Sequence, residues 1–287
     1  MTQRTVYVNG DYVAEKDAKV SVFDRGFLLA DGVYEVSSVM DGKLVDFPGH
    51  MQRLKRSALE LGIAVPWDDE RLLEIHRRLI QLNALKEGMV YLQLTRGSAG
   101  DRDFGYPDAA TPPTLVLFTQ ANALVESRSG REGIRVMTQP DGRWARRDIK
   151  TVQLLYSAMA KMAAKAAGAD DAWFVEGGLV TEGASNNAWM LTHEGVLVTR
   201  ELSHAILSGV TRTVILKIAA SLFLRVEERA FSVAEAQRAK ECFVTSASSF
   251  VTPVIAIDDV TIGDGYPGEV SQQLREAYIT ESRRHAM

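Results

Sequence analysis

The sequence is poor in cysteine and has no long apolar run. Its one thiol, Cys242, cannot close a disulfide within the chain, which excludes a disulfide-stapled secreted scaffold and favours a reducing, cytoplasmic location. Cys242 begins an apolar run, so we expect a buried core thiol rather than a nucleophile. No apolar segment reaches the length of about 20 residues that spans a bilayer, and the polar N-terminus lacks a secretory-signal core, so we expect no membrane association.

An excess of one charge is also missing. The 33 Lys and Arg residues nearly balance the 37 Asp and Glu residues, so we expect no general affinity for nucleic acid or anionic membranes. The five histidines stand singly, without the spacing of a metal site, so we expect no bound metal. Neither a G-x-S-x-G elbow nor a G-x-x-x-x-G-K-[ST] loop occurs, which leaves a hydrolase or a P-loop NTPase without support.

What is present is a mixture of short strands and helices in two halves. The first half predicts strands at 5–8, 32–46 (a pair), 89–94 and 114–119, and helices at 48–62 and 68–85. The second half predicts strands at 134–137, 172–181 (a hairpin), near Trp189 and Val196, 243–245 and 254–257. Its helices are predicted at 153–167, from Gly209, from Ser232 to Glu241 and at the C-terminus.

The order of these elements predicts the fold class and the domains. Neither half alternates strand and helix regularly, which favours an α+β architecture over a doubly wound parallel sheet. The apolar periodicity is lost at 120–132, so we expect a linker there between an N-terminal domain of residues 1–119 and a C-terminal domain of residues 133–287.

Three lysines in the segment 146–168 stand in different contexts. Lys161 and Lys165 are four apart and share one face of a predicted helix, which is typical of solvated charges. Lys150 comes before the helical pattern, at an element boundary, where a lysine can be either a surface charge or a reactive group.

Three further segments are suggestive but weak when taken alone. Residues 206–212 lead through a glycine into a helix, whose first N–H groups and the Thr211 hydroxyl suit an anion. Residues 244–249 add a run of small hydroxyl side chains, and 180–187 place Glu182 at the end of a strand. Ordinary caps and solvated turns have the same composition.

Six motifs, however, occur in the order and approximate spacing of one family. They are DGVYEV at 31–36, HMQRL at 50–54, DIKT at 148–151, VTEGASNN at 180–187, ILSGVTR at 206–212 and FVTSASS at 243–249. Over nearly its whole length the sequence resembles the fold-type IV (class IV) pyridoxal-phosphate aminotransferases, and among them the D-amino acid aminotransferases. The resemblance implies a small N-terminal domain, a larger pseudo-barrel C-terminal domain and pyridoxal 5′-phosphate as the cofactor between them.

The resemblance also assigns roles to residues. Lys150 would form the Schiff base with the cofactor aldehyde and then carry a proton, for which it must be neutral. Glu182 would accept a hydrogen bond from the pyridine nitrogen and keep it protonated, and Arg53 would grip the phosphate. Tyr34 would face the substrate near its carboxylate. The remaining phosphate contacts would come from Val210, Thr211, Ala247 and Ser248.

One loop departs from the family pattern. In the D-alanine enzymes the loop after TRG carries an Arg-x-His pair that traps the substrate α-carboxylate, whereas residues 100–104 read GDRDF and contain no histidine. Arg102 can still clamp a carboxylate through its planar guanidinium. Asp103 weakens the positive field beside it, and Phe104 adds an apolar surface, so the preferred substrate stays open.

The resemblance therefore implies a homodimeric enzyme that transfers an amino group from a D-amino acid, such as D-alanine, to a 2-oxo acid, such as 2-oxoglutarate. A branched-chain L-amino acid aminotransferase, an (R)-amine transaminase and an aminodeoxychorismate lyase are the alternatives within the family. A pyridoxal-phosphate-binding protein without turnover is disfavoured, because binding alone needs neither the electron sink at Glu182 nor the proton carrier at Lys150.

Overall fold

A computed structural model describes residues 4–287, which form two compact units. Unit 1 contains the described residues up to Ala123, together with Ile149–Gln153 and His285–Met287. Unit 2 contains Leu124–Asp148 and Leu154–Arg284. Lys150 thus belongs by its contacts to unit 1, although the chain on either side of its segment belongs to unit 2. The domain boundaries predicted around 120–132 stay a prediction.

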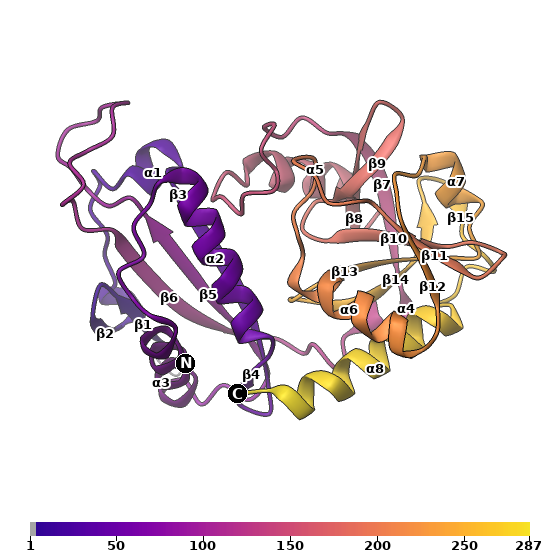
Figure 1. Ribbon diagram of the computed structural model, residues 1–287, viewed down its shortest axis with the longest axis horizontal. Helices are drawn as coiled ribbons and strands as arrows, with labels where there is room; N and C mark the ends of the chain where they lie inside the picture. The colour runs from indigo at the N-terminus through magenta and orange to yellow at the C-terminus, as the bar shows by residue number, and fades with distance from the viewer. Residues whose placement is uncertain (1–3) are drawn as a thin grey trace. The chain divides into compact units, whose positions relative to one another are not determined.

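Unit 1 is built on a six-stranded, wholly antiparallel sheet with the order β2-β1-β6-β5-β3-β4. Helices α2 and α3 contact each other and the sheet, so they cover the same face (Figure 1). A 3-10 turn and a short helix, α1, precede β3. The elements are β1 (Thr5–Val8), β2 (Asp11–Ala14), η1 (Glu15–Asp17), α1 (Arg25–Leu29), β3 (Gly32–Met40), β4 (Lys43–Leu44), α2 (Phe47–Leu61), α3 (Asp69–Leu82), β5 (Gly88–Thr95) and β6 (Thr114–Ala121).

The two-residue period of β3 gives this sheet two chemically different faces. Glu35 is buried and points to α2, where it meets polar side chains described below. Tyr34 lies on the opposite face and stacks on Tyr91 of β5, which stacks in turn on Phe118 of β6, with ring centroids 5.5 and 4.8 Å apart. One strand therefore presents a carboxylate to the helices and a row of aromatic rings on the other side.

Unit 2 contains a nine-stranded sheet with the order β12-β11-β10-β13-β14-β7-β8-β9, to which β15 adds beside β14. The pairs β11–β12, β14–β7 and β7–β8 are parallel, and the other pairs are antiparallel. The strands are β7 (Ile134–Pro140), β8 (Asp171–Glu176), β9 (Leu179–Gly183), β10 (Asn187–Leu191), β11 (Val196–Thr199), β12 (Arg225–Glu228), β13 (Glu241–Ser246), β14 (Phe250–Ile257) and β15 (Val260–Thr261).

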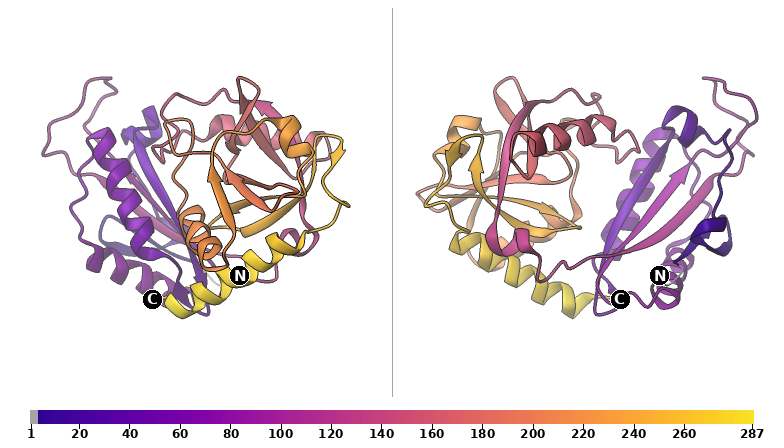
Figure 2. Two further views of the ribbon diagram at one scale, coloured as in Figure 1. Left: turned by 45° about the vertical axis from the view of Figure 1, so that its right-hand side comes forward. Right: turned by 180° about the vertical axis from the view of Figure 1, so that it is seen from behind.

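Helices pack against the strands of unit 2 along its chain (Figures 1 and 2). They are α4 (Arg128–Glu132), α5 (Leu155–Ala166), α6 (Val210–Ser221), α7 (Val233–Gln237) and α8 (Glu269–His285). A buried apolar cluster that includes Trp173, Phe231 and Val244 forms a core of this unit. Both units mix helices with mainly antiparallel pairing, which confirms the predicted α+β class.

A few elements differ from the prediction for identifiable reasons. Helix α1 is only five residues long and its segment has no apolar period, so the sequence does not predict it. Strand β12 is charged and forms through parallel pairing with β11. Helix α3 ends at Leu82, shortly before Ala84 takes a left-handed conformation. Helix α7 ends at Gln237, because Glu241 already begins β13.

Candidate active site

Lys150 of unit 1 is anchored through its backbone beside β3. Its carbonyl accepts a hydrogen bond from the Tyr34 N–H at 3.0 Å, and its own N–H donates to Ser57 Oγ of α2 at 3.3 Å. An isolated bridge between Val33 and Thr151 continues the pairing. The side-chain Nζ lies 4.1 Å from the centroid of the Tyr34 ring. The structure thus brings Lys150 and Tyr34 together, with the amine placed by backbone contacts on both sides.

The two helical lysines of the same segment have ordinary surroundings. Lys165 is exposed in the last turn of α5. Lys161 is half-buried, and its Nζ lies 3.2 Å from Asp171 Oδ1. Only Lys150 combines an element boundary with an aromatic neighbour, so it is the lysine of this segment with a distinctive environment.

Arg53 of α2 is oriented by a buried carboxylate of β3. Its Nε and Nη2 donate to the two oxygens of Glu35 at 2.8 Å each, and His50 Nδ1 lies 2.8 Å from Glu35 Oε2. Burial opposes the ionisation of Glu35, but Arg53 and His50 outweigh it and lower the pKa of this carboxyl to about 2. The carboxylate is therefore charged at neutral pH and holds the guanidinium in one orientation.

Glu182 of unit 2 is a buried carboxylate near the end of β9. Arg143 Nη1 donates to its Oε1 at 2.7 Å, while Asn187 Nδ2 and the Leu207 N–H donate to its Oε2 at 3.0 and 3.1 Å. Burial raises the pKa of Glu182, and the charge and hydrogen bond of Arg143 oppose that rise. This acid is a structured acceptor in a site of low polarity, not the solvated turn residue that its segment alone allows.

The N-terminus of α6 has an unsatisfied donor that suits an anion. Val210 and Thr211 are its first two residues, and no side chain caps the helix at Gly209. Thr211 is buried, and its hydroxyl has no hydrogen-bond partner among residues 4–287. Buried hydroxyls normally find a partner, and free N–H groups with the positive end of the helix dipole favour negative charge. A phosphate fits this helix end.

Asn187 gathers the predicted residues of unit 2 at one end of the sheet. Its amide bonds Glu182 and the Leu207 carbonyl, and its backbone is in register with Thr245 of β13. A Cβ on Gly209 would lie 2.0 Å from Asn187 Oδ1, so only glycine lets the start of α6 come this close. Thr245 is followed by the turn that contains Ala247 and Ser248. Glu182, the start of α6 and this turn therefore meet around one side chain.

Arg102 lies in an exposed loop of unit 1. Its guanidinium stacks on Phe104 at 4.7 Å and, among residues 4–287, makes no hydrogen bond or ion pair. No described contact joins it to Lys150. The loop itself is held by Arg25, whose Nη1 donates to the carbonyls of Asp103 and Gly105 at 2.6 and 3.0 Å. Arg102 is thus a cation on an anchored loop that lines a cavity of about 380 Å³.

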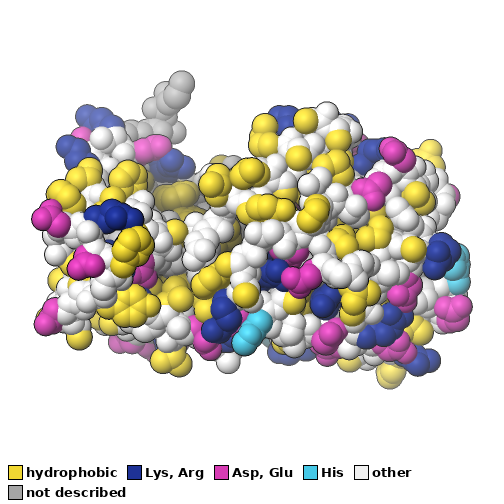
Figure 3. All heavy atoms as spheres, turned by 90° about the horizontal axis from the view of Figure 1, so that it is seen from above, with side chains coloured by type: hydrophobic (Ala, Val, Ile, Leu, Met, Phe, Trp, Pro, Cys, Tyr) yellow, Lys and Arg dark blue, Asp and Glu magenta, His cyan; other side chains and the backbone are white. Residues whose placement is uncertain are grey.

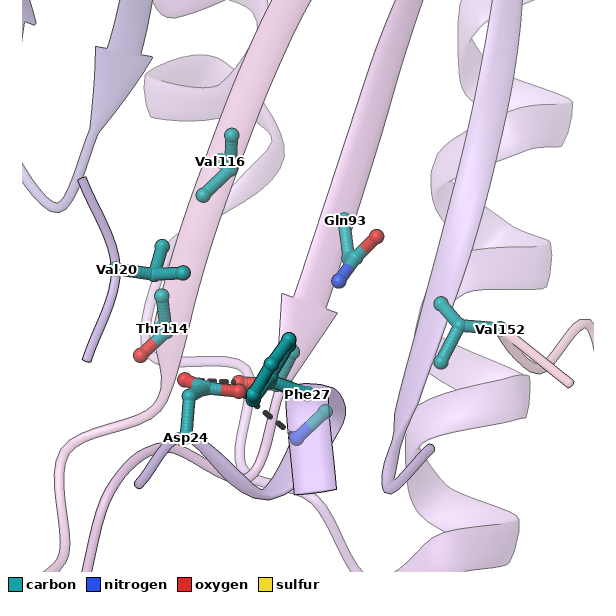
Figure 4. Close-up of a pocket in the computed structure, with 9 residues that line it drawn as sticks. Val20, Asp24, Phe27, Gln93, Thr114, Val116 and Val152 are labelled. Atoms are coloured by element: carbon teal, nitrogen blue, oxygen red, sulfur yellow. Dashed lines mark hydrogen bonds between the residues drawn. The ribbon is translucent and has the colours of Figure 1, made fainter. Parts of the chain in front are cut away.

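A second cavity of unit 1, of about 340 Å³, contains no cationic side chain (Figure 4). Asp24 lies at one end, where it accepts hydrogen bonds from Thr95 Oγ1 and the Gly26 N–H at 2.9 and 2.8 Å. Gln93 and Val152 line the space as well. A carboxylate without a cation repels phosphate, so this cavity does not fit the anion that the start of α6 suits.

Other kinds of site find no support in the described part of the chain. Within residues 4–287, no group of three or more His, Cys, Asp or Glu side chains is arranged to hold a metal ion. No helix in this range is long and apolar enough to cross a membrane. On the face drawn in Figure 3, Lys and Arg side chains are interspersed with Asp and Glu.

Sequence reasoning missed several residues of this arrangement. Glu35 and His50 stand inside two of the quoted motifs, and Asn187 ends a third. Each is a polar residue in or beside an apolar strand or helix, which is a sign of a buried polar contact. Arg143 has no comparable signal, because it stands among other arginines in a polar stretch.

Comparisons with known proteins identify the same chemistry. The model of the family described as amino-transferase class IV matches residues 32–257. The D-alanine aminotransferase of Staphylococcus aureus (strain MSSA476) is 36% identical over 282 residues, which cover 98% of this chain and 99% of that protein. The D-alanine aminotransferase of Bacillus licheniformis is 35% identical and covers 95% of each chain.

The solved structures agree on the fold. The branched-chain aminotransferase of the thermophilic archaeon Thermoproteus uzoniensis, determined with norvaline, superposes with a TM-score of 0.84. It is 26% identical, and the match covers 96% of this chain and 94% of that one. A bacterial-type branched-chain amino acid aminotransferase, from the organism abbreviated T.th. and determined with pyridoxamine 5′-phosphate, superposes with a TM-score of 0.88 at 27% identity, over 99% of this chain and 96% of that one.

Proposed function

We propose that this chain, which belongs to the class IV aminotransferases, transfers the amino group of a D-amino acid to a 2-oxo acid with pyridoxal 5′-phosphate as its cofactor. The 36% identity to D-alanine aminotransferases over nearly both full lengths supports the choice of donor. D-alanine is the donor we expect, and 2-oxoglutarate the acceptor.

The observation that carries this proposal is the pair of features around Asn187 in unit 2. A phosphorylated pyridine needs an acceptor for its ring nitrogen and donors for its phosphate. Glu182 is a buried acceptor, and Thr211 is a buried donor without a partner among the described residues. The same unit thus offers both ends of the cofactor what they require, and the residues present fit the group.

In this proposal Lys150 binds the cofactor and moves the proton. A lysine amine can bond covalently to an aldehyde, and its backbone anchoring in unit 1 leaves the Nζ beside Tyr34 for that role. The amine then takes the proton from the substrate Cα and delivers it during the same half-reaction. Pyridoxal 5′-phosphate, when bound, supplies the electron-withdrawing ring that makes removal of this proton possible.

The other residues hold and orient. Arg53, aligned by Glu35, binds the phosphate as a charged donor, and Val210, Thr211, Ala247 and Ser248 donate further hydrogen bonds to it. Glu182 holds a proton at the pyridine nitrogen. Tyr34 shapes the substrate position near Lys150, and Arg102 receives the substrate carboxylate on its exposed loop. We further infer a cytoplasmic homodimer.

A branched-chain L-amino acid aminotransferase is the second candidate. The observation that favours it is the TM-score of 0.88 to a solved enzyme of that name. Its lower identity, 27% against 36%, places it second. An (R)-amine transaminase and an aminodeoxychorismate lyase share the proposed cofactor residues and differ in the substrate they require.

The test is a donor comparison with purified holoenzyme and 2-oxoglutarate. We expect D-alanine to yield pyruvate and glutamate in equal amounts, while L-alanine, L-leucine and (R)-1-phenylethylamine give little product. A preference for L-leucine would move the chain to the branched-chain enzymes. A preference for the amine would make it an amine transaminase. Pyruvate released from aminodeoxychorismate without any acceptor would make it a lyase.

A further inference from the structure

Arg143 is the only ionic partner of Glu182 among the contacts of residues 4–287. Its Nη1 donates to Glu182 Oε1 at 2.7 Å, and its Nε and Nη2 donate to the two oxygens of Asp141 at 3.0 and 2.8 Å. The other two donors to Glu182, the amide of Asn187 and the N–H of Leu207, are neutral. The charge state of Glu182 therefore depends on Arg143 more than on either neutral donor.

The hydrogen bonds also determine which oxygen of Glu182 has room for another donor. Each carboxylate oxygen accepts about two hydrogen bonds. Asn187 and Leu207 fill Oε2, whereas Oε1 has one contact, from Arg143. A pyridine N–H would therefore approach Oε1 and share it with the guanidinium.

Arg143 belongs to a row of alternating charges that runs from Glu182 to the surface. Asp141 also accepts from Thr181 Oγ1 at 2.7 Å, and Arg147 lies 3.4 Å from Asp141. Arg147 then donates twice to Glu176, at 3.0 Å each, where the chain meets solvent. Although burial opposes the charge of Arg143, Asp141 and Glu182 raise its pKa, so it stays cationic.

We propose that Arg143 is a positioning residue that keeps Glu182 ionised and thereby places the shared proton on the pyridine nitrogen rather than on the carboxyl group. This inference rests on the proposed function and names the residue that sets its electron sink.

The physical reason is a competition for one proton. Pyridine nitrogen and carboxylate form either an ion pair or a neutral pair with the same proton between them. Burial favours the neutral pair, because a charged carboxylate is costly in a site of low polarity. A cation 2.7 Å from Glu182 Oε1, on the side away from the proton, favours the ionised carboxylate and so moves the proton to the nitrogen. A neutral hydrogen-bond donor would do this far less.

The test compares Arg143→Met and Arg143→Lys with wild type, each as holoenzyme loaded with cofactor labelled with ¹⁵N in the ring. The ¹⁵N chemical shift reports directly whether the nitrogen carries a proton. We expect a protonated nitrogen from pH 7 to 9 in wild type and in Arg143→Lys, and a mainly unprotonated one in Arg143→Met. The kcat of Arg143→Met with D-alanine should fall about 10- to 100-fold, with KM changed much less. Arg128→Met, which removes an exposed arginine from its pair with Glu132, is the control and should match wild type.

A protonated nitrogen in Arg143→Met would overturn the inference, even if activity fell, because the residue would then act only on stability. Should Arg143→Met not fold, Arg143→Lys decides, since an unprotonated nitrogen despite the retained cation would also overturn it. A wild-type protein that binds no labelled cofactor would instead contradict the proposed function, so the two failures are distinguishable.

Discussion

The guanidinium of Arg53 donates two hydrogen bonds, each of 2.8 Å, to the carboxylate of Glu35, and both side chains are largely withdrawn from solvent. The pair joins the helix α2 to the face of β3 that lies opposite Tyr34. It couples the stability of unit 1 to the orientation of the residue that we propose for the phosphate.

This pair predicts a dependence of stability on acid. The pKa of Glu35 is about 2 in the folded protein against 4.5 as its ordinary value, so the unfolded chain binds its proton more strongly. The contribution of Glu35 to stability is therefore present above about pH 4.5 and is lost as the pH falls toward 2. Urea unfolding should show this loss in wild type and not in Glu35→Gln. At pH 7 we expect Glu35→Gln to cost about 3–5 kcal/mol, because it leaves Arg53 without its carboxylate.

Glu132→Gln is the matched control, since Glu132 pairs with Arg128 on the surface. Such a pair contributes about 0.2–1 kcal/mol. Equal losses of stability in Glu35→Gln and Glu132→Gln would contradict the role of the buried pair.

Replacing Lys150 by alanine should abolish turnover and leave the fold intact. The hydrogen bonds that anchor this residue come from its backbone, which alanine retains, whereas the covalent link to the cofactor and the proton transfer are lost. We expect at least an about 10³-fold fall in kcat, with an unchanged circular dichroism spectrum. Lys165→Ala, on the exposed face of α5, should be fully active. Transamination at a normal rate by Lys150→Ala would refute the mechanism.

Thr211→Val should weaken cofactor binding without weakening the fold. Its buried hydroxyl has no partner among the described residues, so an isosteric methyl costs the apoprotein almost nothing. In the holoenzyme the variant loses a hydrogen bond to a charged phosphate, about 1.5–3 kcal/mol, which corresponds to a 10- to 100-fold higher Kd for the cofactor. Fluorescence titration of apoprotein measures this Kd.

Thr213→Val is the comparison on the same helix, because the Thr213 hydroxyl already donates to the Gly209 carbonyl at 3.1 Å. Its Kd for the cofactor should stay close to the wild-type value. A larger effect in Thr213→Val than in Thr211→Val would argue against a phosphate at this helix end.

Arg102→Ala should raise KM for D-alanine, by about 10-fold or more, since a charge-assisted contact to the carboxylate is lost. The same variant should leave the slow reaction with (R)-1-phenylethylamine unchanged, because an amine has no carboxylate to bind. Steady-state kinetics with the two donors separates these effects. An equal change with both donors would show that Arg102 shapes the loop rather than binds the substrate.

The sequence was sufficient for most of the fold because the relevant signals are local. The Pro48 start and Gly62 end of α2 and the turn at Asp41-Gly42 depend on neighbouring residues alone. The short helix α1 and the charged strand β12 depend on tertiary contacts instead, which no window of sequence contains.

The site divides in the same way. Glu182, Lys150 and Arg53 could be predicted because they belong to motifs with a known order. The pairing of Arg53 with Glu35, and of Arg143 with Glu182, joins residues 18 and 39 positions apart. Nothing in the local pattern says which of many arginines meets which acid, so these contacts required the structure. The environment of Arg102 was equally open, since its loop has no regular secondary structure.

The most direct test of the central claim is the visible spectrum of the purified holoenzyme during separate titrations with D-alanine and L-leucine, without an acceptor. We predict a yellow protein whose absorption band, from cofactor bound to Lys150, disappears with D-alanine and persists with L-leucine. Loss of the band with L-leucine alone would contradict the assignment to D-amino acids. A colourless protein that cannot be reconstituted with pyridoxal 5′-phosphate would contradict the whole account.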